Sequence, residues 1–189
     1  EQAAQLYRTA LDETLQRFSE KSFDLVIFYA GAEDYFSRNY PQLPRQPQSG
    51  KDLGERLANA LQGLLQEGYQ QAAIIGSDSP DLPLAHVEEA FAALQGSDVV
   101  IAPAEDGGYV LIGESCHHPR LFEAMPWSCA DLMQQTKHIL AEQKIEWQQL
   151  SDWEDVDDAA SLQRLVQRSP ESLTAIHIRE QLAPLLGEG

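Results

Sequence analysis

Carboxylate side chains follow two apolar runs of the sequence, at the points where strands would end. Asp78 lies two residues after the run 72–76, and Asp106 follows the run 99–103 within an Asp-Gly-Gly turn. In parallel α/β sheets, ligands bind just beyond the carboxyl ends of the strands. Carboxylates placed there can hold a divalent cation, which prefers hard oxygen ligands. The pattern therefore predicts one site that binds a metal and a phosphate-bearing ligand.

Each of these acids also has an ordinary structural interpretation. Asp78 could cap the helix expected to begin near Leu84, and Asp81 could be a cap or a support for the metal ligands. Asp106 stands in an Asp-Gly turn, which commonly closes a hairpin between two apolar strands. We favour the functional interpretation for Asp78 and Asp106 and leave Asp81 open.

A third acidic segment, Asp155-Val156-Asp157, follows a weakly alternating run at 146–150. Mg²⁺ often takes one or two protein carboxylates and fills its other positions with phosphate oxygens and water. One of these acids could complete the metal shell, or the segment could cap the following helix, whose first turn carries partial positive charge. Of the two, we select Asp157 as the metal ligand.

Hydrophobic periodicity predicts the elements that place these acids. Apolar residues at three- and four-residue spacing favour helices, with a short one at 119–124. The other helices are expected at 1–20, 53–66, 84–94, 128–143, 157–168 and 170–186. Continuous β-prone runs predict strands at 24–30, 72–76, 99–103 and 109–113, and an edge strand at 146–150. Ser128 is the expected N-cap of its helix, and 40–50 is expected to be a loop. The alternation of strands and helices indicates an α/β fold with a mostly parallel sheet.

Length and composition restrict the class of protein. The 189 residues suit a single domain, 1–189, in which 170–189 forms a C-terminal helical tail. The sequence contains no apolar run of membrane-spanning length and no basic-then-apolar leader, so we expect a cytoplasmic protein that contacts no membrane. Cys116 and Cys129 lie far apart and are expected to be reduced. His117 and His118 have no evident partner ligands in the sequence, so we expect them on the surface.

The charge of the chain bears on its ligands. Thirty acidic residues against 13 basic ones give a formal net charge of −17. This charge opposes binding to nucleic acid, which requires clustered Lys and Arg. An anionic ligand would need a cation to enter an acidic site, which strengthens the metal hypothesis. Over the whole molecule, the same charge also favours solubility.

Several motifs occur in a fixed order along the chain. They are Gly50-Lys51-Asp52-Leu53-Gly54-Glu55-Arg56-Leu57, Gly76-Ser77-Asp78-Ser79-Pro80-Asp81-Leu82-Pro83, Ala102-Pro103-Ala104-Glu105-Asp106-Gly107-Gly108-Tyr109-Val110-Leu111-Ile112-Gly113, Leu121-Phe122, Pro126-Trp127-Ser128 and Asp155-Val156-Asp157-Asp158. From Glu1 to about Leu165, the series resembles the bacterial radical-SAM/selenodomain-associated glycosyltransferase-like family. That family belongs to the nucleotide-diphospho-sugar transferase (GT-A) superfamily and is similar to nucleotidyltransferases such as phospholactate guanylyltransferase.

The resemblance implies a fold, a cofactor and roles for individual residues. It implies a three-layer α/β fold whose mostly parallel sheet is flanked by helices, with Mg²⁺ or Mn²⁺ held by Asp78 and Asp157. Asp106 would act at the acceptor or at the metal, and Arg56 could grip a phosphate of the donor in bidentate fashion or be an ordinary solvated surface charge. The substrate-binding residues that the resemblance implies are Gly54, Arg56, Gly107, Gly108 and Trp127.

The resemblance also implies a first strand and a glycine- and basic-residue loop ahead of the first helix, whereas the sequence given starts at that helix. The missing strand would lie inside the sheet, and its loss would leave backbone N–H and C=O groups unpaired. A homodimer could cover the open sheet.

These observations give three hypotheses for function. The first is a metal-dependent glycosyltransferase-like enzyme with a nucleotide or nucleotide-sugar donor and a small-molecule acceptor. The absence of the first strand and its basic loop could impair this enzyme. The second is a nucleotidyltransferase that acts on a phosphorylated small molecule and releases pyrophosphate. The third is a non-catalytic GT-A-like domain that self-associates through its open sheet.

Overall fold

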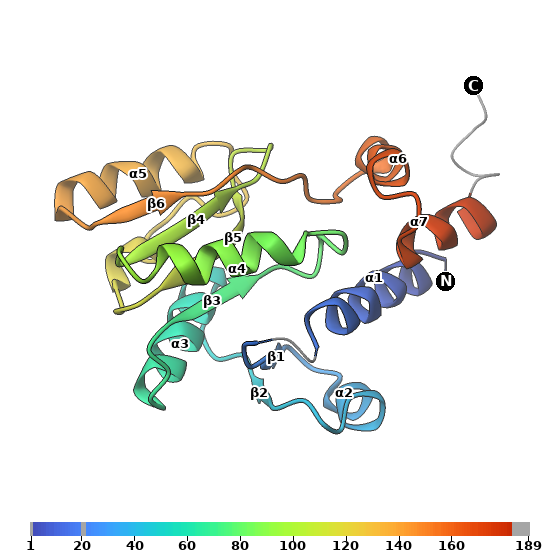
Figure 1. The fold of residues 1–189 in the computed structure, drawn as a ribbon, viewed down its shortest axis with the longest axis horizontal. Coiled ribbons are helices and arrows are strands. Elements are labelled where there is room, and N and C mark those ends of the chain that lie inside the picture. The colour runs from blue at the N-terminus through green and yellow to red at the C-terminus, as the bar shows by residue number, and fades with distance from the viewer. Residues whose placement is uncertain (1, 20–21, 183–189) are drawn as a thin grey trace.

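A four-stranded sheet forms the centre of the protein (Figure 1). A computed structural model describes residues 2–19 and 22–182. The strands in this sheet follow the order β3-β5-β4-β6. Their bounds are β3 (Ala72–Ile75), β4 (Val99–Pro103), β5 (Tyr109–Glu114) and β6 (Trp147–Gln149). Strand β5 runs antiparallel to both β3 and β4, whereas β6 is parallel to β4. Three of the four strands therefore point in one direction, and β5 opposes them because a short turn joins it to β4.

Helices α3 (Leu53–Gln66) and α5 (Leu132–Gln143) cover one face of this sheet, and α4 (Leu84–Ala93) covers the other. The other described helices are α1 (Gln2–Phe18), α2 (Glu33–Asn39), α6 (Ala159–Arg168) and α7 (Leu173–His177), with a 3-10 turn η1 (Pro119–Leu121) and a π turn η2 (Ile178–Leu182). On β4, Val99 and Ile101 face α3 and α5, while Val100 and Ala102 face α4. Alternate residues of one strand thus enter two separate cores, as expected for a sheet buried on both sides. The predicted α/β class, with a sheet flanked by helices, is confirmed.

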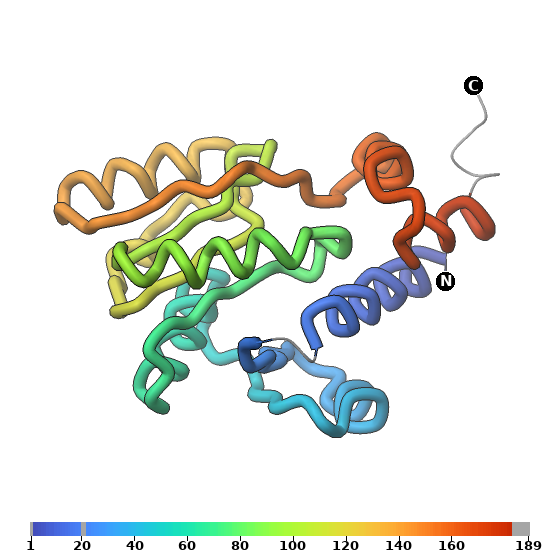
Figure 2. The backbone as a smooth tube through the Cα atoms, viewed as in Figure 1, coloured from blue at the N-terminus to red at the C-terminus, as the bar shows by residue number. Residues whose placement is uncertain are grey.

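The first helix and the last helices pack together at one end of the molecule (Figure 2). Glu13 of α1 is buried and accepts hydrogen bonds from the backbone N–H and the hydroxyl of Thr174, at 2.9 and 2.7 Å. Arg17 donates to the other carboxylate oxygen of Glu13 at 2.8 Å. The buried Glu13 carboxylate, with hydrogen bonds to both of its oxygens, therefore joins α1 to α7, which lies 161 residues further along the chain.

The structure differs from the sequence prediction at several places. Residues 40–50, predicted as a loop, contain strand β2 (Arg45–Pro47), which pairs in parallel with β1 (Ile27–Tyr29). Helix α2 was not predicted, and the strand predicted at 24–30 is hydrogen-bonded over β1 only. The helix predicted at 170–186 is divided between α7 and the π turn up to Leu182, and the rest of it lies outside the described residues.

The predicted N-cap at Ser128 is wrong. Helix α5 begins at Leu132, and Ser128 has a φ of +60° within the preceding turn. The start of α5 packs against the Asp-Gly-Gly turn that follows β4. There the Gly107 carbonyl accepts a hydrogen bond from the Met133 N–H at 2.9 Å. This contact spans 26 residues, so no local sequence pattern could reveal it.

Candidate metal and nucleotide-binding site

Three carboxylates from two segments meet beyond the end of β3. Asp78 follows β3, and Asp155 and Asp157 lie between β6 and α6. One oxygen from each carboxylate lies within 4.8 Å of the others. The Val156 N–H donates to the Asp78 carbonyl at 2.9 Å, which holds the two segments together. The arrangement offers three hard oxygen ligands, the type that Mg²⁺ and Mn²⁺ prefer.

The glycine before Asp78 allows its carboxylate to fold back against the end of the strand. A Cβ atom at Gly76 would lie 2.2 Å from Oδ1 of Asp78. The alternative role of Asp78 as a helix cap has no support, because Pro83 is the N-cap of α4 and α4 has no side-chain capping bond. The position of Asp78 therefore serves the acidic cluster and not the start of the helix.

A different acid caps the helix that follows Asp155 and Asp157. The side chain of Asp158 accepts from the Ser161 N–H at 2.7 Å and forms a capping box with Ser161. The Asp155 and Asp157 carboxylates are therefore free of that role. Trp153 fixes the position of the segment that carries Asp155 and Asp157. Its backbone N–H donates to the Pro103 carbonyl at 3.0 Å, in a short parallel extension of β4.

Burial and mutual repulsion raise the pKa values of two carboxylates of this cluster. Burial, together with the negative charges of Asp106, Asp157 and Asp78, raises the pKa of Asp155 to about 6. Asp78 is open to solvent, but nearby protein atoms partly desolvate its carboxylate and raise its pKa, as do the charges of Asp157 and Asp106. A dication would remove this repulsion and favour the ionised form of every carboxylate.

A pocket of about 410 Å³ opens beside the cluster. Asp78, Asp106 and Asp155 line it together with Gly108 and Trp127. The rings of Tyr109 and Trp127 meet edge to face, with centroids 6.2 Å apart, and form an aromatic wall. Among the described residues, no lysine or arginine lines this pocket. A phosphate group would therefore enter only with a cation that offsets the carboxylates.

The Asp-Gly-Gly turn between β4 and β5 both closes a hairpin and faces the pocket. The Gly108 N–H donates to Oδ1 of Asp106 at 2.8 Å, which orients the exposed carboxylate. Gly107 has a φ of +96°, and a Cβ there would lie 2.2 Å from the Ala130 carbonyl oxygen. Gly107 is therefore needed for the backbone conformation and for close packing, while Gly108 and Asp106 line the pocket.

Two of the predicted substrate-binding residues lie away from the acids. Gly54 is buried at the start of α3, where a Cβ would lie 2.7 Å from Nε1 of Trp127. Its position explains the close approach of α3 to the pocket wall. Arg56 is exposed, its Nε lies 3.4 Å from the Gly50 carbonyl oxygen, and it borders a separate, apolar groove. Phosphate binding by Arg56 remains a prediction.

Sequence reasoning left Asp81 open, and the structure gives it a partner. Its buried carboxylate accepts from Nε and Nη2 of Arg168 at 2.7 and 3.0 Å and from the Ser169 hydroxyl at 2.7 Å. Arg168 also pairs with Glu154, next to Asp155. This group of ion pairs, the Asp81–Arg168 clamp, fixes the loop that carries Asp78 against the segment that carries the other two acids.

A second cluster of metal-ligand types lies elsewhere in the molecule. Asp98, Cys116 and His118 each place a ligand atom within 4.8 Å of the others, although the sequence showed no third ligand for His118. The Cys116 sulfur lies 3.2 Å from Nε2 of His118 and 3.7 Å from Oδ1 of Asp98. Partial burial and the Asp98 charge raise the pKa of the Cys116 thiol, which favours its protonated form. These contacts account for the cluster without a metal.

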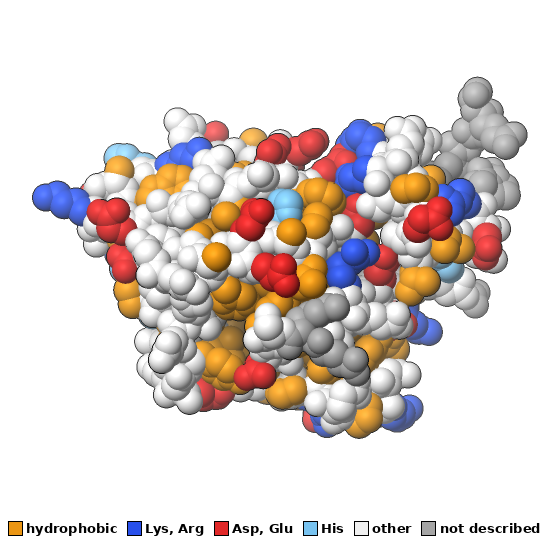
Figure 3. All heavy atoms as spheres, in the orientation of Figure 1, with side chains coloured by type: hydrophobic (Ala, Val, Ile, Leu, Met, Phe, Trp, Pro, Cys, Tyr) orange, Lys and Arg blue, Asp and Glu red, His pale blue; other side chains and the backbone are white. Residues whose placement is uncertain are grey.

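Figure 3 shows the distribution of charged side chains on one face of the molecule. Acidic side chains are spread over the face in Figure 3, where no large basic patch interrupts them. No helix among the described residues is both long enough and apolar enough to span a membrane.

Comparison with known proteins supports the fold and gives the family. No curated protein sequence matches the chain. The crystal structure of a protein from Desulfovibrio desulfuricans G20, provisionally named a nucleotide-diphospho-sugar transferase, has 35% sequence identity and a TM-score of 0.88. The match covers 98% of this chain and 84% of that one. The structure of 4-diphosphocytidyl-2C-methyl-D-erythritol synthase matches at a TM-score of 0.56 and 15% identity over 84% of this chain and 88% of that one, a likeness of fold alone.

Residues 13–129 match the family model described as an uncharacterized protein conserved in bacteria, DUF2064. This match covers more than half of the 189 residues. The chain therefore belongs to the DUF2064 family.

Proposed function

We propose that the protein is a metal-dependent transferase that moves a sugar from a nucleotide-diphosphate donor to a small-molecule acceptor. The observation that carries this proposal is the convergence of Asp78, Asp155 and Asp157 beside a pocket without basic residues among those described. The name of the D. desulfuricans relative supports the donor class. The donor nucleotide, the sugar and the acceptor are left open.

Some residues of the site would hold the metal, and others would bind the acceptor. Asp78 and Asp157, with Asp155 beside them, would hold Mg²⁺ or Mn²⁺, which when bound neutralises the charge of a diphosphate leaving group. Asp106 also lines the pocket and would orient the acceptor hydroxyl and accept its proton. Gly107 and Gly108 would shape the pocket floor, and the Trp127 ring would border the acceptor. Gly54 supports this wall from behind, and Arg56 would reach a donor phosphate only if its side chain turned toward the pocket.

The second candidate is a nucleotidyltransferase, and the fold likeness to 4-diphosphocytidyl-2C-methyl-D-erythritol synthase favours it. It would use the same metal site to join a nucleotide to a phosphorylated acceptor. The two reactions differ in their products, because a nucleotidyltransferase releases pyrophosphate and a sugar transferase releases a nucleoside phosphate. A non-catalytic domain that self-associates as a homodimer would release neither.

A thermal-shift screen with Mn²⁺ or Mg²⁺ and a panel of nucleoside diphosphates and nucleotide sugars tests the proposed donor site. A ligand present at about 100 times its Kd should stabilise the protein by about 2.7 kcal/mol, which raises Tm by several degrees in a domain of this size. We expect a shift that requires the metal, disappears in Asp78→Asn and persists in Asp34→Asn, whose carboxylate is exposed on α2. The proposal is wrong if no donor shifts Tm, or if Asp78→Asn responds as fully as Asp34→Asn.

A further inference from the structure

The group formed by Asp98, Cys116 and His118, which we call the Cys–His cluster, lies at the far end of the main sheet from the acidic pocket. Asp98 comes directly before β4, and Cys116 and His118 follow the last residue of β5. The acidic pocket lies at the other ends of the same two strands, where Asp106 stands in the turn that joins them. The Cys–His cluster is therefore separate from the proposed transferase site.

The pairing of β4 with β5 brings the Cys–His cluster together. The two strands are antiparallel, with Val99 opposite Glu114, so the chain before Val99 and the chain after Glu114 leave the sheet side by side. The Ser115 N–H donates to the Asp98 carbonyl at 2.9 Å and extends the pairing beyond the strand ends. Cys116 therefore comes next to the Asp98 side chain, although 18 residues separate them.

A buried carboxylate fixes the turn that presents two of these ligands. Glu114 is 0% exposed, and one of its oxygens accepts from the backbone N–H of His118 at 3.1 Å. Its other oxygen lies 2.8 Å from Nδ1 of His117, whose ring stacks on Phe122 with the centroids 6.0 Å apart. The turn that carries Cys116 and His118 is therefore held in place before any ligand arrives, which lowers the cost of binding.

The contacts within the Cys–His cluster need no metal, but they hold its atoms at the separations that a tetrahedral zinc ion requires. Zn–S bonds of about 2.3 Å and Zn–N or Zn–O bonds of about 2.0 Å place sulfur about 3.5 Å from either atom. The Cys116 sulfur lies 3.2 Å from Nε2 of His118 and 3.7 Å from Oδ1 of Asp98. One ion can therefore contact all three side chains after only small movements.

We infer that Asp98, Cys116 and His118 bind a Zn²⁺ ion through a carboxylate oxygen, a thiolate and an imidazole nitrogen. Zinc accepts this mixed set of ligands, whereas Mg²⁺ and Mn²⁺ prefer oxygen ligands. Among the described residues, the group has these three members. Cys116 is exposed and the other two are half-buried, so the ion can enter from solvent and a water molecule can take the fourth position.

The charges of the site balance when zinc is bound. The Cys116 thiol loses its proton to the solvent as the S–Zn bond replaces the S–H bond. The thiolate and the Asp98 carboxylate then carry two negative charges, which offset the charge of the dication. His118 binds as the neutral imidazole.

Bound zinc would link three segments at this end of the sheet. Asp98 joins the start of β4, and Cys116 and His118 join the end of β5. The Asp98 N–H also donates to the Glu146 carbonyl at 2.8 Å, directly before β6. We therefore expect zinc to stabilise the folded protein, because it binds the assembled ligands and not the separated ones. This role does not depend on the proposed transferase activity.

Titration of the reduced protein with Co²⁺, a spectroscopic substitute for zinc, tests the inference. A thiolate bound to Co²⁺ gives a charge-transfer band in the near ultraviolet, and carboxylates alone give none, so the acidic cluster does not contribute to this band. We expect the band to saturate at one Co²⁺ per chain and to disappear when Zn²⁺ is added. It should be lost in Cys116→Ser and retained in Cys129→Ser, the matched control at the other exposed cysteine.

Calorimetry with Zn²⁺ measures the same site in the Asp78→Asn background, where the acidic cluster is impaired. We expect the affinity to fall at least about tenfold when Cys116→Ser or His118→Gln is added. The absence of a thiolate band, or equal bands in Cys116→Ser and Cys129→Ser, would overturn the inference. Either result leaves Mn²⁺ binding at Asp78 unaffected, so failure of the inference is separable from failure of the proposed function.

Discussion

At the scale of single residues, the candidate site is a group of carboxylates that destabilise one another. The Asp155 carboxyl should change its protonation state near pH 6, because burial and its acidic neighbours raise its pKa to about 6. The folded protein therefore holds this proton more tightly than the unfolded chain does. Protonated Asp155 stabilises the fold fully below its ordinary pKa of 3.8, and this contribution is lost as pH rises through about 6.

Replacing Asp155 with Asn should therefore stabilise the metal-free protein in a pH-dependent way. At pH 8 we expect Asp155→Asn to raise the free energy of unfolding by about 1 kcal/mol, after allowance for solvent screening. The gain should shrink as pH falls through about 6 and vanish below about 4, where the wild-type side chain is also neutral. Tm measured in a chelator at pH 8 and pH 4 checks this, and an equal gain at both values would contradict it. Asp34→Asn, on the exposed face of α2, is the matched control.

At the scale of elements, the loop between β3 and α4 is held by the Asp81–Arg168 clamp. The Asp81 side chain is 1% exposed and Arg168 is 23% exposed, so the pair is largely removed from water. Loss of one member would leave a buried charge without its partner, which costs far more than loss of a surface pair. The clamp also connects the loop of Asp78 to the segment of Asp155 through Glu154.

Arg168→Leu should lower the free energy of unfolding by about 3–5 kcal/mol. The exposed pair Arg38–Asp34 provides the control, and Arg38→Leu should cost less than about 1 kcal/mol. Urea denaturation measures both variants. Adding Asp81→Leu to Arg168→Leu should recover part of the loss, because no charge then remains buried without a partner. Equal stability of the two arginine variants would show that the clamp is not a major support.

The same scale shows which elements the sequence could predict. Helix α3 matches its predicted bounds because local signals define it, with Asp52 as N-cap and a leucine repeat along one face. Strand β4 also matches, because a buried strand is a continuous apolar run. Strand β2 escaped prediction, since its Arg-Gln-Pro sequence has no β pattern and pairing with β1 alone defines it.

Long-range contacts explain what the sequence could not show about the site. The strand-end rule brought attention to Asp78 and Asp106, and the Asp-x-Asp pattern identified the third segment. The partner of Asp81 lies 87 residues away, so spacing could not separate its structural role from a functional one. For the same reason, the sequence could not reveal that Gly54 packs against Trp127, and the substrate-binding role that the resemblance implies for Gly54 stays a prediction.

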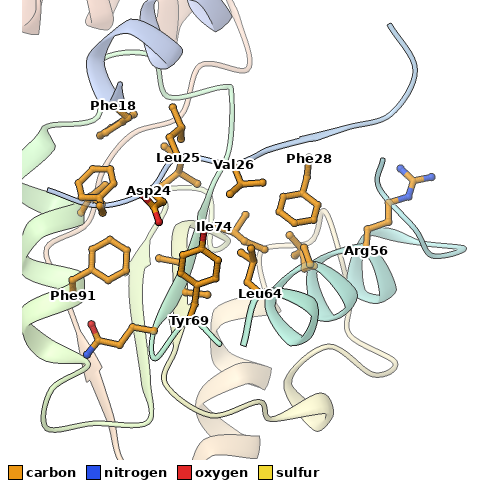
Figure 4. Close-up of a pocket in the computed structure, with 18 of the residues that line it drawn as sticks. Phe18, Asp24, Leu25, Val26, Phe28, Arg56, Leu64, Tyr69, Ile74 and Phe91 are labelled. Atoms are coloured by element: carbon orange, nitrogen blue, oxygen red, sulfur yellow. The ribbon is translucent and has the colours of Figure 1, made fainter. Parts of the chain in front are cut away.

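At the scale of the whole molecule, the acidic pocket adjoins an apolar groove between β1 and β3 (Figure 4). The two share Phe28 of β1 and Ile74 and Ile75 of β3 as lining residues. The net charge of −17 acts over the same distance, because it disfavours entry of a free diphosphate and favours entry of a metal complex. The proposed function therefore makes donor binding dependent on the metal.

Calorimetric titration with Mn²⁺ tests this dependence most directly. The structure predicts one Mn²⁺ site per chain, at least about tenfold weaker in Asp78→Asn and in Asp157→Asn, and unchanged in Asp34→Asn. The wild-type affinity should fall as pH drops through about 6, since protons compete with the metal for Asp155. Equal Mn²⁺ affinity in Asp78→Asn and Asp34→Asn would contradict the account and remove the acidic cluster as a metal site.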